Sequence, residues 1–160
     1  VLTDEVARFV RAVGPEHTEV QARMAAFADE HDFPNIGPES GAVLRLLARL
    51  TDAETVFEFG SGFGYSASWF LRGGAGRVIL TEFDADELDQ GREFMREAGL
   101  ADRCVFEGGD GLVRVGLDRV DPHDRGKRAV AGGAKRLVVV HEVFVPRQHV
   151  VHGRRWATAG

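Results

Sequence analysis

Apolar residues recur with a helical period in the first fifty residues of the chain. In the segment 3–14, Val6, Phe9, Val10 and Val13 fall at i, i+3, i+4 and i+7, which predicts one apolar face of a helix. The segment 16–31 predicts a second helix whose inward residues are Val20, Met24 and Phe27. Two helices are therefore expected before residue 32.

A third helix is predicted after Gly37, because Pro38 suits the first helical position. Its apolar stripe consists of Val43, Leu46, Leu47 and Leu50. Three helices are thus expected to precede the first strand.

From residue 55 onward, strand-like and helix-like segments alternate. Strands are predicted at 55–59, 77–83 and 103–110, with helices at 65–73 and 84–98 between them and Gly99 as the C-cap of the second helix. Such alternation implies right-handed crossovers and a parallel sheet. The predicted fold class is α/β, a Rossmann-like doubly wound, mostly parallel sheet with N-terminal helices.

The first predicted strand runs directly into the glycine-rich turn GSGFG at 60–64. Ligands of parallel α/β sheets bind beyond the carboxyl ends of the strands, where a bare backbone lets a cofactor approach closely. Gly60, Gly62 and Gly64 provide that room and tolerate positive φ. Ser66 can then open the next helix, whose N-terminus favours an anionic group. An ordinary tight turn remains the alternative interpretation.

Two acidic residues follow the next two strands at corresponding positions. Glu82 ends the second strand, where a carboxylate can accept both hydroxyl hydrogens of a ribose, and Asp110 ends the third, where one can accept from an adenine amino group. Either alone is typical of a solvated surface acid. Together with the glycine turn they outline an adenosine site. A nicotinamide-dependent oxidoreductase is disfavoured, because Tyr65 stands where G-x-G-x-x-G requires its third glycine.

Length and composition favour one domain. The chain has 160 residues, 44% of them hydrophobic, and no run approaches the roughly 18 apolar residues of a membrane span. Its acid-bearing start does not resemble a signal peptide, so a cytoplasmic protein without a membrane partner is expected. The single cysteine, Cys104, is interpreted as a small packing residue rather than a nucleophile.

Charge changes sharply near residue 112. Residues 1–112 contain 21 acidic residues, 10 arginines and no lysine, a net charge of −11, whereas residues 113–160 contain 4 acidic and 10 basic residues, a net charge of +6. The acidic, lysine-free part is typical of a halophilic protein. The basic segment has few aromatic residues besides Trp156, so nucleic-acid binding is not expected.

Other candidate chemistry in the chain lacks an organising motif. Potential metal ligands occur after residue 112 without HExxH or CxxC spacing, which favours ordinary loop polarity. They are Asp121, His123, Asp124, His141 and Glu142. Ser61 lies within the glycine turn, and no G-x-S-x-G nucleophile elbow is present. No catalytic residue and no metal ligand is assigned.

Three stretches in order resemble a known family. They are GPESGAVLRLLARL, VFEFGSGFGYSASWFL and RVILTEFDADELDQGREFMREAGLADRCVFEGGDGL, which together cover residues 37–112. This region resembles the class I S-adenosylmethionine-dependent methyltransferases, in the O-methyltransferase branch that includes the catechol and caffeoyl-CoA enzymes. The resemblance implies S-adenosylmethionine as cofactor and methyl transfer to a small-molecule hydroxyl.

The resemblance also implies roles for individual residues. Glu58 and the loop of Gly60, Ser61, Gly62 and Gly64 would surround the methionine portion of the cofactor. Tyr65 and Ser66 would help to fix its carboxylate, Glu82 would hold the ribose, and Asp110 would lie near the adenine. Residues 1–36 would form a helical cap that covers the substrate or contacts a second copy in a homodimer. A divalent metal assists the acceptor hydroxyl in this branch.

The family pattern stops near residue 112. The strand and aspartate expected within about twenty residues of Asp110 are missing, and the first good strand is 136–140. Residues 113–160 are expected to be an atypical segment of the same domain, arising from truncation or frame disruption, from divergence, or as a phosphate-binding arm. A cofactor-binding remnant without turnover is therefore the alternative to an active methyltransferase.

Overall fold

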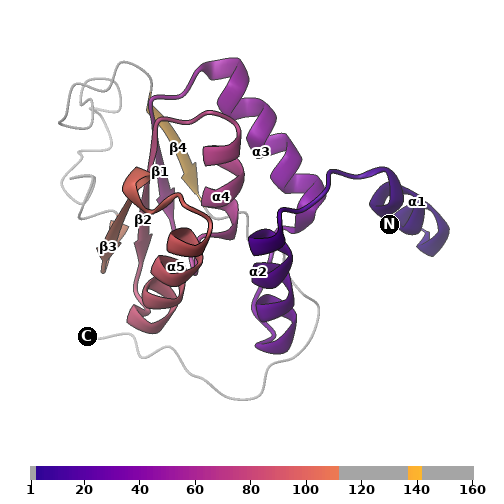
Figure 1. Cartoon of the computed structure of the whole chain (residues 1–160), viewed down its shortest axis with the longest axis horizontal. Helices are drawn as coiled ribbons and strands as arrows, with labels where there is room; N and C mark the ends of the chain where they lie inside the picture. Colours follow the sequence, from indigo (N-terminus) through magenta and orange to yellow (C-terminus); the bar gives the residue numbers. More distant parts are fainter. Residues whose placement is uncertain (1–2, 112–136, 142–160) are drawn as a thin grey trace, which may run out of the picture.

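The fold is built on a parallel sheet. The computed structural model describes residues 3–111 and 137–141. Its strands are β1 (Thr55–Phe59), β2 (Arg77–Glu82), β3 (Cys104–Gly108) and β4 (Leu137–His141), in the order β3-β2-β1-β4. All neighbouring pairs are parallel, with Val56 opposite Val78 and Val138 (Figure 1). The predicted α/β fold with a mostly parallel sheet is confirmed.

Two helices connect the first three strands and lie on one face of the sheet (Figure 1). They are α4 (Tyr65–Arg72) and α5 (Ala85–Glu97), and a short helix η1 (Ala101–Arg103) leads into β3. The Asp84 side chain caps α5 by accepting from the N–H groups of its first turn. The C-cap residue of α5 is Ala98 rather than the predicted Gly99. Gly99 follows the cap and adopts the left-handed conformation.

Three helices precede the sheet, as the apolar periodicity predicts. They are α1 (Asp4–Val13), α2 (Glu19–Glu30) and α3 (Gly37–Thr51). Helix α2 begins with a capping box in which the side chains of Thr18 and Gln21 bond to each other's backbone. Helices α2 and α3 pack on α4, while α1 projects away from the rest of the molecule (Figure 1).

The core lies between the sheet and these helices. Trp69 of α4 is fully buried and belongs to one apolar cluster with Phe63, Phe70, Met24 and Leu80. Helix α3 approaches Trp69 closely, because a Cβ added at Gly41 would lie 2.4 Å from the Trp69 ring. The large buried aromatic and the small facing residue together fix how α3 crosses α4.

The apolar stripe of α3 does not face this core. Val43, Leu46, Leu47 and Leu50 are 45% to 72% exposed, whereas Gly41 and Ala48 are buried. The periodicity therefore predicts the helix correctly but marks the face that the described residues leave uncovered. The fully buried residues of α3 are small where the helix packs on α4, and Leu44 packs partly buried against the core.

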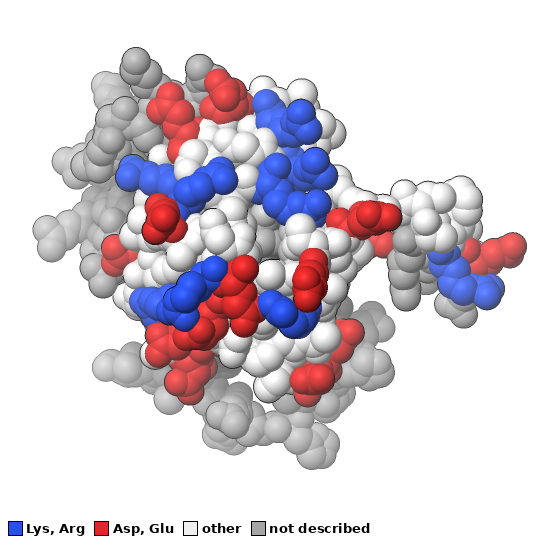
Figure 2. Space-filling view, viewed as in Figure 1, with Lys and Arg blue, Asp and Glu red and all other residues white. Residues whose placement is uncertain are grey.

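Charged side chains of both signs cover the outer helices (Figure 2). On α5, Arg92 pairs with Asp89 and Arg96 with Glu93, each at 2.5 Å. Within the described residues, no helix is long and apolar enough to cross a bilayer.

Candidate functional site

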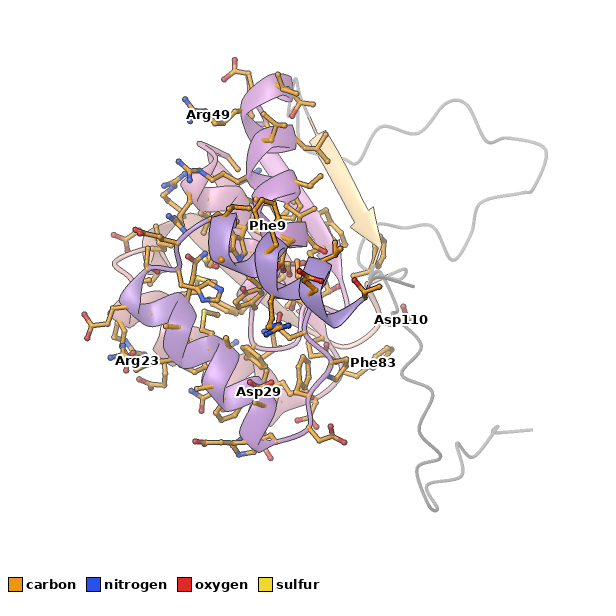
Figure 3. All side chains as sticks on the ribbon, turned by 90° about the vertical axis from the view of Figure 1, so that its right-hand side faces the viewer. Phe9, Arg23, Asp29, Arg49, Phe83 and Asp110 are labelled. Atoms are coloured by element: carbon orange, nitrogen blue, oxygen red, sulfur yellow. The ribbon has the colours of Figure 1, made fainter. Side chains whose placement is uncertain are left out.

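The candidate site lies at the carboxyl ends of β1, β2 and β3. Two backbone hydrogen bonds tie the loops that follow β1 and β3 to the end of β2. The Ser61 N–H donates to the Thr81 carbonyl at 3.0 Å, and the Gly109 N–H donates to the Glu82 carbonyl at 2.9 Å. Figure 3 labels Phe83 and Asp110, which belong to two of these loops. The topology thus brings the predicted site segments to one edge of the sheet.

The glycine turn adopts a backbone that other residues disfavour. Gly60, Gly62 and Gly64 have φ of 64°, 50° and 85°, in the left-handed region. Helix α4 begins at Tyr65, as predicted, and its N-cap is Gly64, so Ser66 lies in the first turn rather than at the cap. A Cβ at Gly62 would lie 2.4 Å from the Phe33 ring, so this aromatic occupies the space of a side chain there.

Glu82 is tied to the glycine turn by its side chain. Its Oε2 accepts from the Gly62 N–H at 3.0 Å. Its Oε1 accepts from the N–H groups of Phe83 at 2.6 Å and Asp84 at 3.3 Å. Three backbone donors therefore hold the carboxylate in one orientation at the end of β2. Oε2 retains one lone pair for a further donor.

Glu58 lies under the turn, at the end of β1. Its carboxyl group is buried, and Oε1 accepts a hydrogen bond from the Ser66 hydroxyl on the first turn of α4. The Thr81 hydroxyl donates to the Glu58 carbonyl at 2.7 Å, which joins β1 to β2 at this level. The structure thus brings Glu58 and Ser66 together directly below the turn.

The Tyr65 side chain points away from the turn and into the helical layer. Its hydroxyl lies 2.6 Å from His17 Nε2, and its ring lies near Trp69. Burial is the main cause that raises the pKa of Tyr65 to about 12. The phenol is therefore neutral near pH 7 and links the segment before α2 to the start of α4.

The loop after β3 offers open space beside these groups. Strand β3 ends at Gly108, so Asp110 lies two residues beyond the strand, where it is exposed. Gly109 has a φ of 104°, and a Cβ added there would meet nothing within 4 Å. In contrast, a Cβ at Gly111 would lie 2.6 Å from the Thr81 hydroxyl, so the chain turns back closely over β2.

The remaining candidates show little sign of a reactive site. Burial is the main cause that raises the pKa of the half-buried Cys104 thiol to about 11, which agrees with a packing role. Asp121, His123, Asp124 and Glu142 lie outside the described residues, and of His141 only the backbone is described. Within 3–111 and 137–141, no three potential ligands cluster as a metal site would require.

A family model described as O-methyltransferase matches residues 16–124. The chain belongs to the O-methyltransferase family. Among individual relatives, a catechol O-methyltransferase from Mycobacterium tuberculosis is 34% identical over 95 residues, which are 57% of this chain and 43% of that protein. The matched parts of the chain span less than half the length of such relatives.

Solved structures of O-methyltransferases and related methyltransferases share the fold. A methyltransferase from Geobacter sulfurreducens superposes with a TM-score of 0.65 at 28% identity, covering 72% of this chain and 60% of the other. The O-methyltransferase from Bacillus cereus in complex with SAH (S-adenosylhomocysteine) superposes with a TM-score of 0.64 at 26% identity. The superposition covers 71% of this chain and 53% of the other.

Three residues at or next to the site were not assigned from the sequence. Phe33 packs over Gly62, His17 bonds to Tyr65, and Phe83 is 75% exposed beside Glu82. The first two depend on contacts across about 30 and 48 residues, which no local periodicity encodes. Phe83 had a detectable signal, because it is an apolar residue placed just beyond the predicted ribose-binding acid.

The partly buried position of His17 predicts that stability depends on pH. Burial and the charge of Arg72 lower the pKa of His17 from its usual 6.5, against an opposing effect of Glu39. As pH falls through about 6.5, the unfolded chain takes up this proton before the folded chain does. We expect the free energy of unfolding to decrease over that range, and we expect His17→Gln to remove part of the decrease.

The measurement is urea unfolding of both proteins at a series of pH values between about 7.5 and 5.5. If the free energy of unfolding of His17→Gln depended on pH as strongly as that of the wild-type chain, His17 would not be the cause of the decrease.

Proposed function

We propose that this chain binds S-adenosylmethionine and takes part in methyl transfer to a hydroxyl group of a small molecule. The observation that carries the proposal is Glu82, held at the end of β2 beside the glycine turn by its bond to the Gly62 N–H. Family membership and the likeness to the Bacillus cereus enzyme with SAH support it.

The groups at this edge fit an adenosyl cofactor with an amino-acid tail. The glycine turn lets a ligand approach the backbone, and the space at Gly109 accommodates a flat ring. Glu82 accepts from a ribose hydroxyl through the remaining lone pair of Oε2, and Asp110 accepts from the adenine amino group. Phe83 supplies an exposed apolar surface beside the purine.

The amino-acid tail of the cofactor is proposed to lie at the start of α4. The first-turn N–H groups of a helix have no acceptor within the helix, and the positive end of its dipole favours a carboxylate. Because the Tyr65 hydroxyl already bonds to His17, we assign its backbone N–H, rather than its phenol, to this carboxylate. The Ser66 hydroxyl donates to Glu58, and this bond fixes the first turn of α4 relative to the end of β1.

S-adenosylmethionine supplies a methyl group activated by its sulfonium. The protein's part in the reaction is to hold the cofactor in one orientation, to exclude water and to align an acceptor oxygen with the C–S bond. Glu82 and the glycine turn perform the first task among the described residues. We propose no metal ligand and no catalytic base among them.

The setting of this activity is proposed from composition. The acidic, lysine-free part of the chain supports the proposal that the protein works in a salt-rich cytoplasm. There a strongly hydrated acidic surface keeps a protein soluble. Assays are accordingly designed in concentrated potassium chloride.

The direct test of activity is transfer of a labelled methyl group from S-adenosylmethionine to a simple catechol. The proposal predicts a labelled methyl ether whose formation requires the protein and is reduced in Glu82→Ala. A folded protein that binds SAH but yields no product with catechols or other hydroxyl acceptors would contradict the transferase assignment. That outcome would support the non-catalytic binding alternative.

A further inference from the structure

Helices α2 and α4 each place a buried polar side chain at their contact. Gln21 of α2 is 1% exposed and Ser68 of α4 is 3% exposed, although Met24 and Trp69 of the same two helices belong to the apolar core. A buried polar group costs free energy unless its hydrogen bonds are made. These two side chains therefore depend on bonds to each other and to their neighbours.

The two side chains form a chain of hydrogen bonds from the start of α2 to the first turn of α4. Gln21 Nε2 donates to the Ser68 hydroxyl at 2.8 Å, and this hydroxyl donates to the Tyr65 carbonyl at 2.6 Å. Gln21 Oε1 accepts from the Thr18 N–H at 3.1 Å and from the guanidinium of Arg72. Both ends of the Gln21 amide group are thus bonded, which holds it in one orientation.

The residues just before α2 contact the same face of α4. His17 Nε2 lies 2.6 Å from the Tyr65 hydroxyl, and the Glu16 carbonyl accepts from Arg72 at 3.4 Å. Tyr65, Ser68 and Arg72 stand at i, i+3 and i+7, so they form one stripe along α4. The start of α2 therefore bonds to α4 from its first residue to its last.

This chain of bonds ends on a peptide group of the candidate site. The Tyr65 carbonyl and the Ser66 N–H belong to the same planar peptide unit. That N–H lies in the first turn of α4, where the helix provides no acceptor for it. A bond that fixes the Tyr65 carbonyl also fixes the direction in which the Ser66 N–H points. Gln21 thus acts, through Ser68, on a donor at the place proposed for the cofactor tail.

We propose that Gln21 and Ser68 are positioning residues for the amino-acid tail of the cofactor, an inference that rests on the proposed function. They hold the first turn of α4 so that its N–H groups converge on the carboxylate of the tail. The adenosine part is assigned to other elements, with Glu82 at the end of β2 and Asp110 beyond β3. Loss of the bond between Gln21 and Ser68 should therefore weaken recognition of the tail and leave recognition of the adenosine unchanged.

Two ligands separate these effects. SAH carries the amino-acid tail, whereas methylthioadenosine has the same adenosine and sulfur without it. Calorimetric titration into Ser68→Ala, as the full chain in concentrated potassium chloride, should show a loss of SAH affinity of about five- to tenfold, part of one hydrogen bond to a charged group. The affinity for methylthioadenosine should change by less than about twofold.

Gln21→Leu should give the same pattern, because leucine has a similar volume and no polar atoms. Ser68→Ala deletes a single oxygen and leaves α2 unaltered, so it tests the proposal independently of whether Gln21→Leu folds. Circular dichroism and cooperative unfolding show that each variant is folded.

Thr18→Ala is the matched control. It removes the hydroxyl that caps α2 by accepting from the Gln21 N–H, and it leaves the Gln21 side chain to bond to Ser68. The free energy of unfolding should fall, as it does when a cap is lost. The ratio of the two affinities should stay at the wild-type value, because the first turn of α4 keeps its bonds.

The outcomes distinguish this inference from the proposed function. Equal losses of affinity for both ligands in Ser68→Ala and Gln21→Leu would show a merely structural role and overturn the inference, as would unchanged affinities in both. The binding of SAH by the wild-type chain would still stand in either case. A folded wild-type chain that binds neither ligand would contradict the proposed function, and this inference with it.

Discussion

Replacement of Glu82 by alanine should weaken SAH binding by about ten- to a hundredfold. Hydrogen bonds to a charged group are worth about 1.5–3 kcal/mol each, and about 1.4 kcal/mol corresponds to a factor of ten. Alanine removes the proposed acceptor for a ribose hydroxyl. It also removes the bond from the Gly62 N–H that fixes the glycine turn. Calorimetric titration of SAH into each variant measures the loss.

Two further variants separate these contributions. Glu82→Gln keeps one oxygen that can accept from Gly62, so its affinity should lie between those of the wild-type chain and Glu82→Ala. Glu93→Ala is the matched control, since Glu93 is an exposed acid on α5 that pairs with Arg96. Equal affinity of Glu82→Ala and Glu93→Ala would exclude Glu82 from the site.

Replacement of Gly62 by alanine should destabilise the fold by about 1–3 kcal/mol. One cause is the left-handed backbone, with a φ of 50°. The other is the Phe33 ring, 2.4 Å from the position of the added Cβ. Because Phe33 also packs against Phe63, the ring cannot move without disturbing the core. Denaturant unfolding of the variant measures the change in free energy.

Gly99→Ala separates the two causes. Gly99 has a similar φ of 66°, but a Cβ added there would meet nothing within 4 Å. Gly99→Ala should therefore lose only the free energy of unfolding that comes from the left-handed backbone, and Gly62→Ala should lose more. Adding Phe33→Leu to Gly62→Ala should recover part of the difference. If Gly62→Ala cost no more than Gly99→Ala, Phe33 would not constrain the turn.

Much of the site could be predicted because its elements are local. A strand, a glycine turn and the following helix occupy adjacent positions, so the three glycines and Ser66 could be placed from periodicity and turn chemistry, whereas the family resemblance implied Glu58 and Tyr65. Glu82 followed from the same reasoning one crossover later. Parallel strands bring their carboxyl ends to one edge, and the backbone bond between Gly109 and Glu82 confirms that arrangement.

What the sequence did not reveal depends on contacts between distant segments. Tyr65 follows the glycine turn directly, but its hydroxyl bonds to His17, forty-eight residues earlier in the chain. Likewise, the periodicity of α3 identifies an apolar face without saying that Gly41 and Ala48, rather than Leu46, Leu47 and Leu50, are buried. Small residues carry little hydrophobic signal, yet they allow the closest helix packing.

The central claim is that the edge formed by β1, β2 and β3 binds an adenosyl cofactor. Calorimetric titration of SAH into the wild-type chain, in concentrated potassium chloride, tests it most directly. The account predicts saturable binding of one SAH per chain. A chain that is folded by circular dichroism and cooperative unfolding, yet shows no binding, would contradict it.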